Sequence, residues 1–269
     1  MSFSIQGKTA IITGAANGVG LALARHFLDE GANVMMADRD EVRLADECGT
    51  FGEQGKNTRF FAGDLREKLT VANLLSATIS AFDRVDILIN ASRQMLTTNP
   101  FDPADTSVGT LLDQNIHAAL RLSQTVARRM ILQAEEDGGG EDSIGAIINI
   151  SSITSRRTHP DLLGYSISAA ALDQATRSLA IALAPHRIRV NAVAFGSVMS
   201  ASLRDSLAVT DGLRKEILQC TPLGRIGAAR EVAGAVQFLS SDGADFITGE
   251  ILTVDGGRTL LDAVSTAAH

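Results

Sequence analysis

Short runs of consecutive apolar residues recur along the chain, and stretches with helical spacing separate them. An apolar run that does not alternate with polar residues is typical of a strand buried on both faces of a sheet. Such strands, when they alternate with helices, predict right-handed crossovers and a parallel sheet. The predicted strands are residues 8–14, 32–38, 58–64, 85–92, 145–151, 187–195 and 250–256. The predicted helices are residues 19–30, 39–49, 67–82, 106–133 and 164–184.

This pattern predicts an α/β fold, with a doubly wound parallel sheet of about seven strands flanked by helices. The chain of 269 residues is long enough for one large domain with a sizeable core, so residues 1–269 are expected to form a single domain. The polar, glycine-rich segment 135–143 is predicted to be a solvated loop before the fifth strand.

Composition and charge exclude several classes of function. Apolar residues make up 45% of the chain and charged residues 20%, as in an ordinary globular protein. The net charge is −7 and no basic run occurs, which argues against a nucleic-acid surface. We find no signal-peptide pattern and no run that could span a bilayer, so the expected location is cytoplasmic. Cys48, Cys220 and the five histidines show no metal-ligand spacing, and no metal is expected.

A glycine-rich turn follows the first predicted strand and begins the first predicted helix. Its sequence is TGAANGVG, residues 13–20. Gly14 would permit a tight turn, Gly18 would let the backbone approach a ligand, and Gly20 would let the helix pack closely on the sheet. The free N–H groups at a helix N-terminus there could bind a pyrophosphate, although the turn alone could be structural.

The residue that ends the second predicted strand bears on which dinucleotide binds. A carboxylate at Asp38 can accept hydrogen bonds from both hydroxyls of an adenosine ribose and would repel a 2′-phosphate. This favours NAD over NADP. Arg39 is the counter-evidence, because its guanidinium could pair with that phosphate, and Asp38 could instead be a plain strand-end residue or a helix cap.

Taken together, the motifs resemble those of the short-chain dehydrogenase/reductase family. They are TGxxxGxG at 13–20, Asp38, GDL at 63–65, INA at 89–91, NISS at 149–152 and Tyr165. The resemblance extends from Gly7 to about Gly257 and implies a Rossmann-type fold that binds a nicotinamide dinucleotide. The cofactor-binding residues that it implies are Gly14, Asn17, Gly18, Val19, Gly20, Asp38, Arg39, Asp64, Leu65, Asn90, Ala91, Tyr165, Gly196, Val198 and Ser200. This chain has Ser92 and Phe195 where the family usually has glycine and proline.

The resemblance also implies hydride transfer between an alcohol carbon and the nicotinamide. Asn115, Ser152 and Tyr165 match the family's catalytic asparagine, serine and tyrosine. Tyr165 would take the alcohol's proton, or return it to a ketone, while Ser152 would orient the substrate oxygen. Taken singly, Asn115 could cap a turn, Ser152 could satisfy a strand end, and Tyr165 could be a core ring with a solvated hydroxyl.

One position breaks the family pattern. The family motif is Tyr-x-x-x-Lys, whereas this chain reads Tyr165-Ser-Ile-Ser-Ala169. Residues i and i+4 share a helix face, so the family's ammonium lies beside the phenol, favours the phenolate and binds the nicotinamide ribose. A free tyrosine has a pKa of about 10, too high for a base near neutral pH without such help. No lysine is near in sequence, and Arg156 and Arg157 should not overlie the ribose, so no residue in register is predicted to replace the lysine.

Ala169 has two explanations. It is an engineered Lys→Ala change in an otherwise active enzyme, which the retention of Asn115, Ser152 and Tyr165 favours. Alternatively it is a natural loss, giving a non-catalytic NAD-binding protein that acts as a sensor or an assembly subunit. Turnover is expected to be slow, because losing one preorganised charge typically costs on the order of 10²–10³ in rate. Lysine at position 169 is expected to raise turnover sharply and lower the pH at which activity appears.

The resemblance places the substrate beside residues 92–102, 153–164 and 196–225, the last being the family's mobile lid. Arginines 93, 156 and 157 indicate a polar or anionic substrate, or simply a solvated rim, whereas apolar Met95, Leu96 and Met199 suit a sterol or hydroxyacyl group. The substrate class is therefore open among sugars and polyols, hydroxy acids, hydroxyacyl thioesters and hydroxysteroids. Helices 106–133 and 164–184 match elements that pair across subunits in the family, which implies a homotetramer or, second, a dimer. Their apolar residues could instead belong to the core of one chain.

Overall fold

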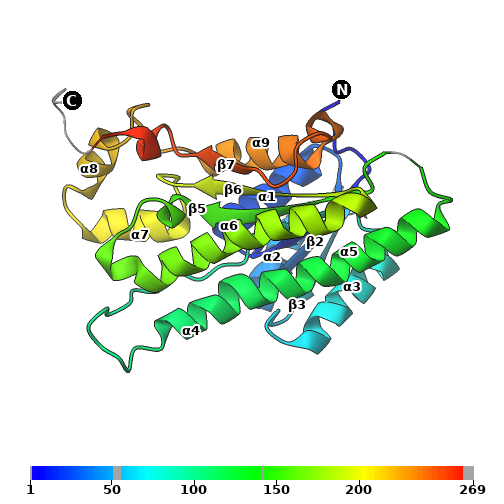
Figure 1. The fold of residues 1–269 in the computed structure, drawn as a ribbon, viewed down its shortest axis with the longest axis horizontal. Helices are drawn as coiled ribbons and strands as arrows, with labels where there is room; N and C mark the ends of the chain where they lie inside the picture. Colours follow the sequence, from blue (N-terminus) through cyan, green and yellow to red (C-terminus); the bar gives the residue numbers. More distant parts are fainter. Residues whose placement is uncertain (1, 51–55, 141, 263–269) are drawn as a thin grey trace.

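The computed structural model describes residues 2–50, 56–140 and 142–262, and its seven strands form one parallel sheet (Figure 1). The strands are β1 Thr9–Thr13, β2 Asn33–Asp38, β3 Thr58–Ala62, β4 Ile87–Asn90, β5 Gly145–Ser152, β6 Ile188–Phe195 and β7 Ile251–Val254. Their order is β3-β2-β1-β4-β5-β6-β7, and every neighbouring pair is parallel. The predicted fold class and all seven predicted strands are confirmed.

Helices cover both faces of the sheet (Figure 1). The α-helices are α1 Gly18–Asp29, α2 Glu41–Thr50, α3 Lys68–Phe82, α4 Ser107–Leu112, α5 Ala118–Glu136, α6 Leu163–Leu183, α7 Ala201–Val209, α8 Leu213–Gln219 and α9 Ala229–Ser240. Short 3-10 helices occur at Ile153–Ser155, Pro160–Leu162, Ala184–His186, Asp242–Ala244 and Arg258–Leu260. The predicted helices are present, and α7 and α8 lie in the segment predicted to be a lid. Helix α9, between β6 and β7, was not predicted.

The predicted long helix 106–133 is interrupted by a π-helical turn. Helix α4 continues into a π-helix over Asp113–His117, and α5 follows directly. A π-turn inserts one extra residue into a helix and is frequent at functional sites. It includes Asn115, a predicted catalytic residue, which is 6% exposed.

Two apolar cores explain why the strands are continuous apolar runs. Side chains of successive strand residues point to opposite faces. Ile11 and Met35 pack against α3, α5 and α6, whereas Ile12 and Met36, their neighbours in sequence, pack against α1 and α9. Both faces of the central strands are therefore buried, and no alternation with polar residues can appear.

The order of the strands reverses between β1 and β4. The chain proceeds from β1 outward through β2 to β3, then returns to place β4 on the other side of β1. Ligands of open parallel sheets bind at the carboxyl ends of the strands beside such a reversal. The loops after β1 and β4 meet there, and they carry the glycine turn and residues 91–95.

No helix in the described part of the chain is long and apolar enough to cross a membrane.

Candidate functional site

The glycine turn after β1 has the geometry that its sequence indicates. Gly14 and Gly18 have φ angles of +67° and +57°, in the left-handed region. A Cβ on Gly20 would lie 2.1 Å from the Gly14 carbonyl oxygen, and a Cβ on Gly14 would lie 2.8 Å from the carbonyl oxygen of Ala91. Nothing lies within 4 Å of a Cβ built on Gly18, so its backbone faces open space. The turn therefore packs tightly against the protein at Gly14 and Gly20, and its backbone is accessible at Gly18.

Asp38 orients its carboxylate with backbone donors. Its Oδ2 accepts a hydrogen bond of 3.2 Å from the Ala16 N–H, and its Oδ1 accepts bonds of 2.7 and 3.2 Å from the N–H groups of Arg39 and Asp40. These bonds fix the carboxylate beside the glycine turn and leave lone pairs free for further donors. Asp38 is thus more than a strand-end residue, because it ties β2 to the turn after β1.

Asp64 is held by a neighbouring arginine. The Arg66 guanidinium pairs with both carboxylate oxygens of Asp64, and this hydrogen bonding lowers the pKa of the carboxyl below its ordinary value. This pairing favours the ionised form of Asp64, which accepts hydrogen bonds. The adjacent Leu65 is 8% exposed and contributes to the core under α3.

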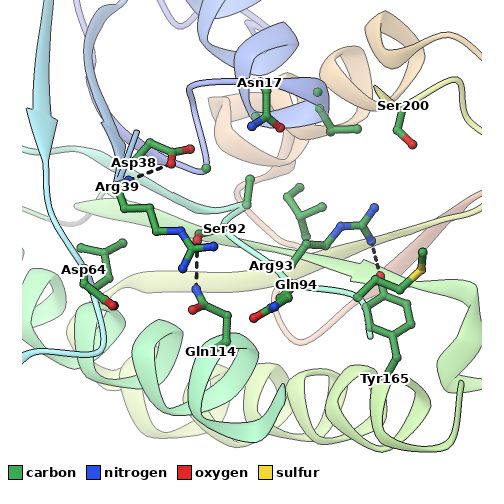
Figure 2. A pocket seen from close by; sticks show the side chains of 18 of the residues that line it. Asn17, Asp38, Arg39, Asp64, Ser92, Arg93, Gln94, Gln114, Tyr165 and Ser200 are labelled. Atoms are coloured by element: carbon green, nitrogen blue, oxygen red, sulfur yellow. Dashed lines mark hydrogen bonds between the residues drawn. The ribbon is translucent and has the colours of Figure 1, made fainter. Parts of the chain in front are cut away.

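A cleft of about 380 Å³ connects these groups to the predicted catalytic tyrosine. Figure 2 shows Asp38, Arg39 and Asp64 at one end of the cleft and Arg93 and Tyr165 at the other. The volume lies in the usual range for small-molecule sites. Of the predicted cofactor-binding residues, those that line this cleft are Gly14, Asn17, Gly18, Val19, Gly20, Asp38, Arg39, Asp64, Leu65, Ala91, Tyr165 and Ser200.

Three predicted cofactor-binding residues do not line this cleft. Asn90 lines a smaller cavity next to it. Gly196 and Val198 line a separate cavity of about 560 Å³ beside β7 and the C-terminal 3-10 helix. Val198 forms a parallel bridge with Gly227. The Gly227 N–H donates to the Ser197 carbonyl, and the Met199 N–H donates to the Gly227 carbonyl. The peptide groups of Val198 itself therefore face away from Gly227. Ser200 lines the main cleft and caps α7, because its hydroxyl accepts a 3.2 Å bond from the Leu203 N–H.

The predicted catalytic residues meet in a small cavity of about 20 Å³ next to the cleft. Its lining includes Asn90, Asn115, Ser152, Tyr165 and Ala169. Tyr165 lines both spaces and is 5% exposed. Helix α6 carries Tyr165 and Ala169, while β5 ends at Ser152 and the π-turn carries Asn115. A cavity of this size has room for about one water molecule.

Two amide side chains hold the surrounding framework. Asn90 donates bonds of 2.9 and 2.8 Å to Ser123 Oγ and Asn149 Oδ1, which fastens the end of β4 to α5 and β5. Asn115 accepts a 2.8 Å bond from the Gln94 N–H and donates one of 3.0 Å to the Gln94 carbonyl. Asn115 also donates 3.0 Å to Ser168 Oγ on α6. The π-turn therefore ties the loop after β4 to the tyrosine helix.

A cation stands beside the phenol, although no residue in register with the family's lysine was found in the sequence. Arg93 Nη1 donates a 2.5 Å hydrogen bond to Tyr165 Oη, as Figure 2 shows. The same guanidinium lies 4.3 Å from the centre of the Phe195 ring. From the sequence, Arg93 indicated only a polar substrate, because it lies 72 residues from Tyr165 along the chain. The topology could have indicated this contact, because β4 and β5 are parallel neighbours and the loop after β4 lies at the same edge of the sheet as the end of β5.

The described residues contain no group of three or more His, Cys, Asp or Glu side chains that could hold a metal ion. Cys48 and Cys220 are both free thiols.

Comparisons with known proteins find similar oxidoreductases along most of the chain. A family model described as enoyl-(acyl carrier protein) reductase matches residues 14–259. An uncharacterized oxidoreductase of Mycobacterium tuberculosis is 35% identical over 265 residues, covering 96% of this chain and 94% of that protein. The 7alpha-hydroxysteroid dehydrogenase of Escherichia coli is 32% identical over 256 residues, covering 94% of each chain.

A solved structure resembles the whole fold. It is a gluconate 5-dehydrogenase from Burkholderia cenocepacia in complex with NADP and tartrate, with a TM-score of 0.86 and 29% identity. The match covers 97% of this chain and 98% of that one.

Proposed function

Since the chain belongs to the short-chain dehydrogenase/reductase family, we propose that this oxidoreductase interconverts a secondary alcohol and a ketone with a nicotinamide dinucleotide. One observation carries the proposal: the Tyr165 side chain lines both the cleft beside the glycine turn and the small cavity that contains Ser152 and Asn115. A phenol at that junction can exchange a proton with a substrate oxygen placed next to the cofactor.

The residues of the cleft fit a dinucleotide. The positive-φ turn at Gly14 and Gly18, and the close approach of Gly20 to Gly14, leave open backbone at the N-terminus of α1, where a pyrophosphate is stabilised. Asp38 offers an oriented carboxylate to a ribose. When bound, the nicotinamide accepts or supplies the hydride of the reaction.

In alcohol oxidation, the substrate carbon loses a hydride, which carries two electrons, and its hydroxyl loses a proton. Tyr165 Oη takes that proton and later releases it to solvent; in ketone reduction it donates the proton instead. Ser152, which is 6% exposed at the end of β5, orients the substrate oxygen. Asn115 holds the loop and the helix that form the two walls of the site.

NAD is proposed as the preferred cofactor. The Asp38 carboxylate lies beside the glycine turn at the cleft end away from Tyr165, where it favours ribose hydroxyls and opposes a 2′-phosphate (Figure 2). Arg39 lines the same end and is the group that would favour NADP. The Burkholderia relative was solved with NADP, so the choice rests on this chain's own residues.

The substrate class is proposed to be one of four: sugars and polyols, hydroxy acids, hydroxyacyl thioesters, and hydroxysteroids. The similar proteins include a hydroxysteroid dehydrogenase and a gluconate dehydrogenase, which span polar and apolar substrates. Gln94 and Met95 line the cleft near Tyr165 and present one polar and one apolar side chain.

The predicted slow turnover due to Ala169 is untested, and its premise that no positive charge stands beside the phenol does not hold, because Arg93 brings one there. A non-catalytic NAD-binding protein that acts as a sensor or assembly subunit is the second candidate, and the absence of lysine at position 169 is the observation that favours it.

A panel of secondary alcohols and ketones, one or more from each proposed class, tests the two candidates. It is run with NAD, NADP and their reduced forms, alongside equilibrium binding of NADH. Cofactor-dependent turnover of at least one compound is expected, with NAD preferred. Tight NADH binding with no turnover across the panel would favour the sensor.

We also propose a homotetramer. Helices α5 and α6 present the exposed apolar side chains Leu132 and Ile181, which are 51% and 76% exposed. A groove between the two helices is lined by apolar residues that include Ile131, Leu179 and Leu183. A mass of four chains is expected from light scattering, and Ile181→Glu should reduce it. A monomer at all concentrations would contradict this proposal.

A further inference from the structure

We propose that Arg93 is a catalytic residue, whose guanidinium supplies the positive charge that position 169 lacks and stabilises the phenolate of Tyr165. The expected effect of Arg93 on turnover rests on the proposed function, whereas its expected effect on the ionisation of Tyr165 does not. Arg93 touches the atom that exchanges the proton, since its Nη1 lies 2.5 Å from Tyr165 Oη.

The hydrogen bond has the polarity that a phenolate requires. A guanidinium has N–H donors and no acceptor, so the bond to Tyr165 Oη runs from Arg93 to the oxygen. Such a donor bonds more strongly to a charged oxygen than to a neutral one. Arg93 therefore stabilises the deprotonated form, while keeping its own protons throughout the reaction.

The surroundings hold Arg93 at this oxygen. The Phe195 ring lies 4.3 Å from the guanidinium carbon and is itself 5% exposed, so it forms a cation–π wall behind the charge. The ion pairs among the described residues do not include Arg93, so no carboxylate neutralises it there.

The backbone on either side of Arg93 is clamped. The N–H groups of Ala91 and Ser92 donate bonds of 3.0 and 2.9 Å to Thr13 Oγ1, and Asn115 holds both peptide groups of Gln94. Arg93 thus projects from a segment fixed both to β1 and to the π-turn. Because these bonds already fix the backbone, less conformational entropy is lost when the long Arg93 side chain is held at the phenol.

The departures from the family pattern, Ser92, Phe195 and Ala169, lie around Arg93 and Tyr165. Arg93, Ser92, Tyr165 and Ala169 line the same small cavity, and Phe195 packs on the guanidinium. A small residue at position 169 leaves one cation, not two, beside the phenol. On this reading Ala169 is the natural partner of Arg93, and an engineered origin is not needed to explain it.

Arg93 is also the only charged side chain in the lining of this cavity. The charged residues that line the main cleft, Asp38, Arg39 and Asp64, lie at its opposite end (Figure 2). Asp173 on α6 accepts a 2.6 Å bond from Ser151 Oγ, and Asp113 and His117 of the π-turn pair with each other and are exposed. The guanidinium therefore dominates the field at Tyr165 Oη among these groups.

The chain permits a direct test, because Tyr165 is its only tyrosine and it contains no tryptophan. The near-ultraviolet absorbance of tyrosinate then reports the ionisation of this one phenol, without substrate or cofactor. An opposite charge within hydrogen-bond distance is expected to change the ratio of phenolate to phenol by about tenfold or more. Arg93→Leu should therefore lower that ratio by this factor at a fixed alkaline pH where both proteins are folded by circular dichroism.

Two variants serve as controls. Arg93→Lys keeps a charge and should retain most of the phenolate. Arg177→Leu removes one exposed arginine from the same helix, 12 residues or about 18 Å beyond Tyr165, and should leave the titration unchanged. Identical titrations of the parent and Arg93→Leu would overturn the inference, as would an equal change in Arg177→Leu.

A second test moves the positive charge from position 93 to position 169 and measures both the phenolate and the turnover. In the Arg93→Leu background, Ala169→Lys should restore both the phenolate and the turnover, whereas Ala169→Lys in the parent should add little. A sharp rise of turnover in the parent on Ala169→Lys would overturn the role of Arg93. If no compound is turned over but the phenolate depends on Arg93, the proposed function fails while this inference stands. If turnover occurs and neither readout responds to Arg93→Leu, the inference fails while the function stands.

Discussion

The two ends of the cleft are built in different ways. The end at the glycine turn is formed by backbone: positive φ angles, a Gly14–Gly20 approach that leaves no room for a Cβ, and peptide N–H groups on Asp38. The end at Tyr165 is formed by side chains from four elements, held by Asn115 and Arg93. Backbone sites tolerate little variation, whereas a side-chain charge can be delivered from a different strand. This difference explains how the second end can keep Asn115, Ser152 and Tyr165 and yet depart from the family pattern at Ala169.

The largest effect is expected at the side-chain end, from Tyr165→Phe. The change removes only the hydroxyl, so turnover should fall about 10²- to 10⁴-fold, the usual contribution of a general acid or base. NADH binding, measured by the fluorescence of the reduced nicotinamide, should change little. Turnover close to that of the parent would remove Tyr165 from the reaction.

The backbone end should fail in another way, through loss of its shape. In Gly20→Ala the added Cβ would lie 2.1 Å from the Gly14 carbonyl oxygen. Neither the Gly14 carbonyl nor the backbone of residue 20 can move away without opening the turn. We expect weak or no NADH binding and a loss of roughly 1–3 kcal/mol in the free energy of unfolding, as for other overpacked sites. Gly234→Ala on α9 is the matched control, since nothing lies within 4 Å of its Cβ and alanine favours a helix. Equal stability of both variants would contradict this description of the turn.

A smaller effect on cofactor choice is expected from Asp38→Asn. Loss of the negative charge should weaken NAD binding and strengthen NADP binding, so that the ratio of their dissociation constants changes by about tenfold, as a charged hydrogen bond is worth about 1.5–3 kcal/mol. Asp40→Asn, which alters a neighbouring carboxylate bonded to the Arg43 N–H, should leave the ratio unchanged. An unchanged ratio in Asp38→Asn would argue against NAD selection by this carboxylate.

The smallest effect concerns a carboxylate outside both ends. Glu231 accepts bonds from Arg225 and from the Ala228 N–H, and the Arg225 guanidinium lowers the pKa of Glu231 from 4.5 to about 2. A lowered pKa contributes stability that is present above about pH 4.5 and is lost as the pH falls toward 2. Glu231→Gln should therefore be slightly less stable than the parent at pH 7 and equal to it near pH 2 in denaturant unfolding. Added salt should reduce the difference, because the pair is exposed. A difference that grows as the pH falls would contradict the sign.

Much of the fold followed from the sequence, for physical reasons. Short continuous apolar runs such as residues 145–151 are typical of strands that are buried on both faces, and each of the seven was found. The glycine turn and Asp38 could also be predicted, because backbone geometry restricts which residues occur there. Helix α9 was missed although it carries an apolar face of Val232, Val236 and Leu239, a pattern that helical spacing could have revealed.

The side-chain end was only partly predictable. Asn115, Ser152 and Tyr165 could be found from their spacing, and they line one cavity. The contact between Arg93 and Tyr165 joins residues 72 positions apart, and no local pattern encodes such a pair. The π-turn at Asp113–His117 also went unseen, because one inserted residue barely disturbs the apolar spacing of a long helix. Gly196 and Val198 were assigned to the cofactor, and the structure places them at a second cavity.

The most direct test of the account follows a label from one end of the cleft to the other. Ketones of the panel are incubated with NADH that carries deuterium at its transferable position, and the product is analysed by mass spectrometry. The account predicts deuterium on the former carbonyl carbon with the parent protein and almost none with Tyr165→Phe. NADH that binds in the cleft but transfers no label to any ketone would contradict the claim that this phenol and the glycine turn serve one reaction.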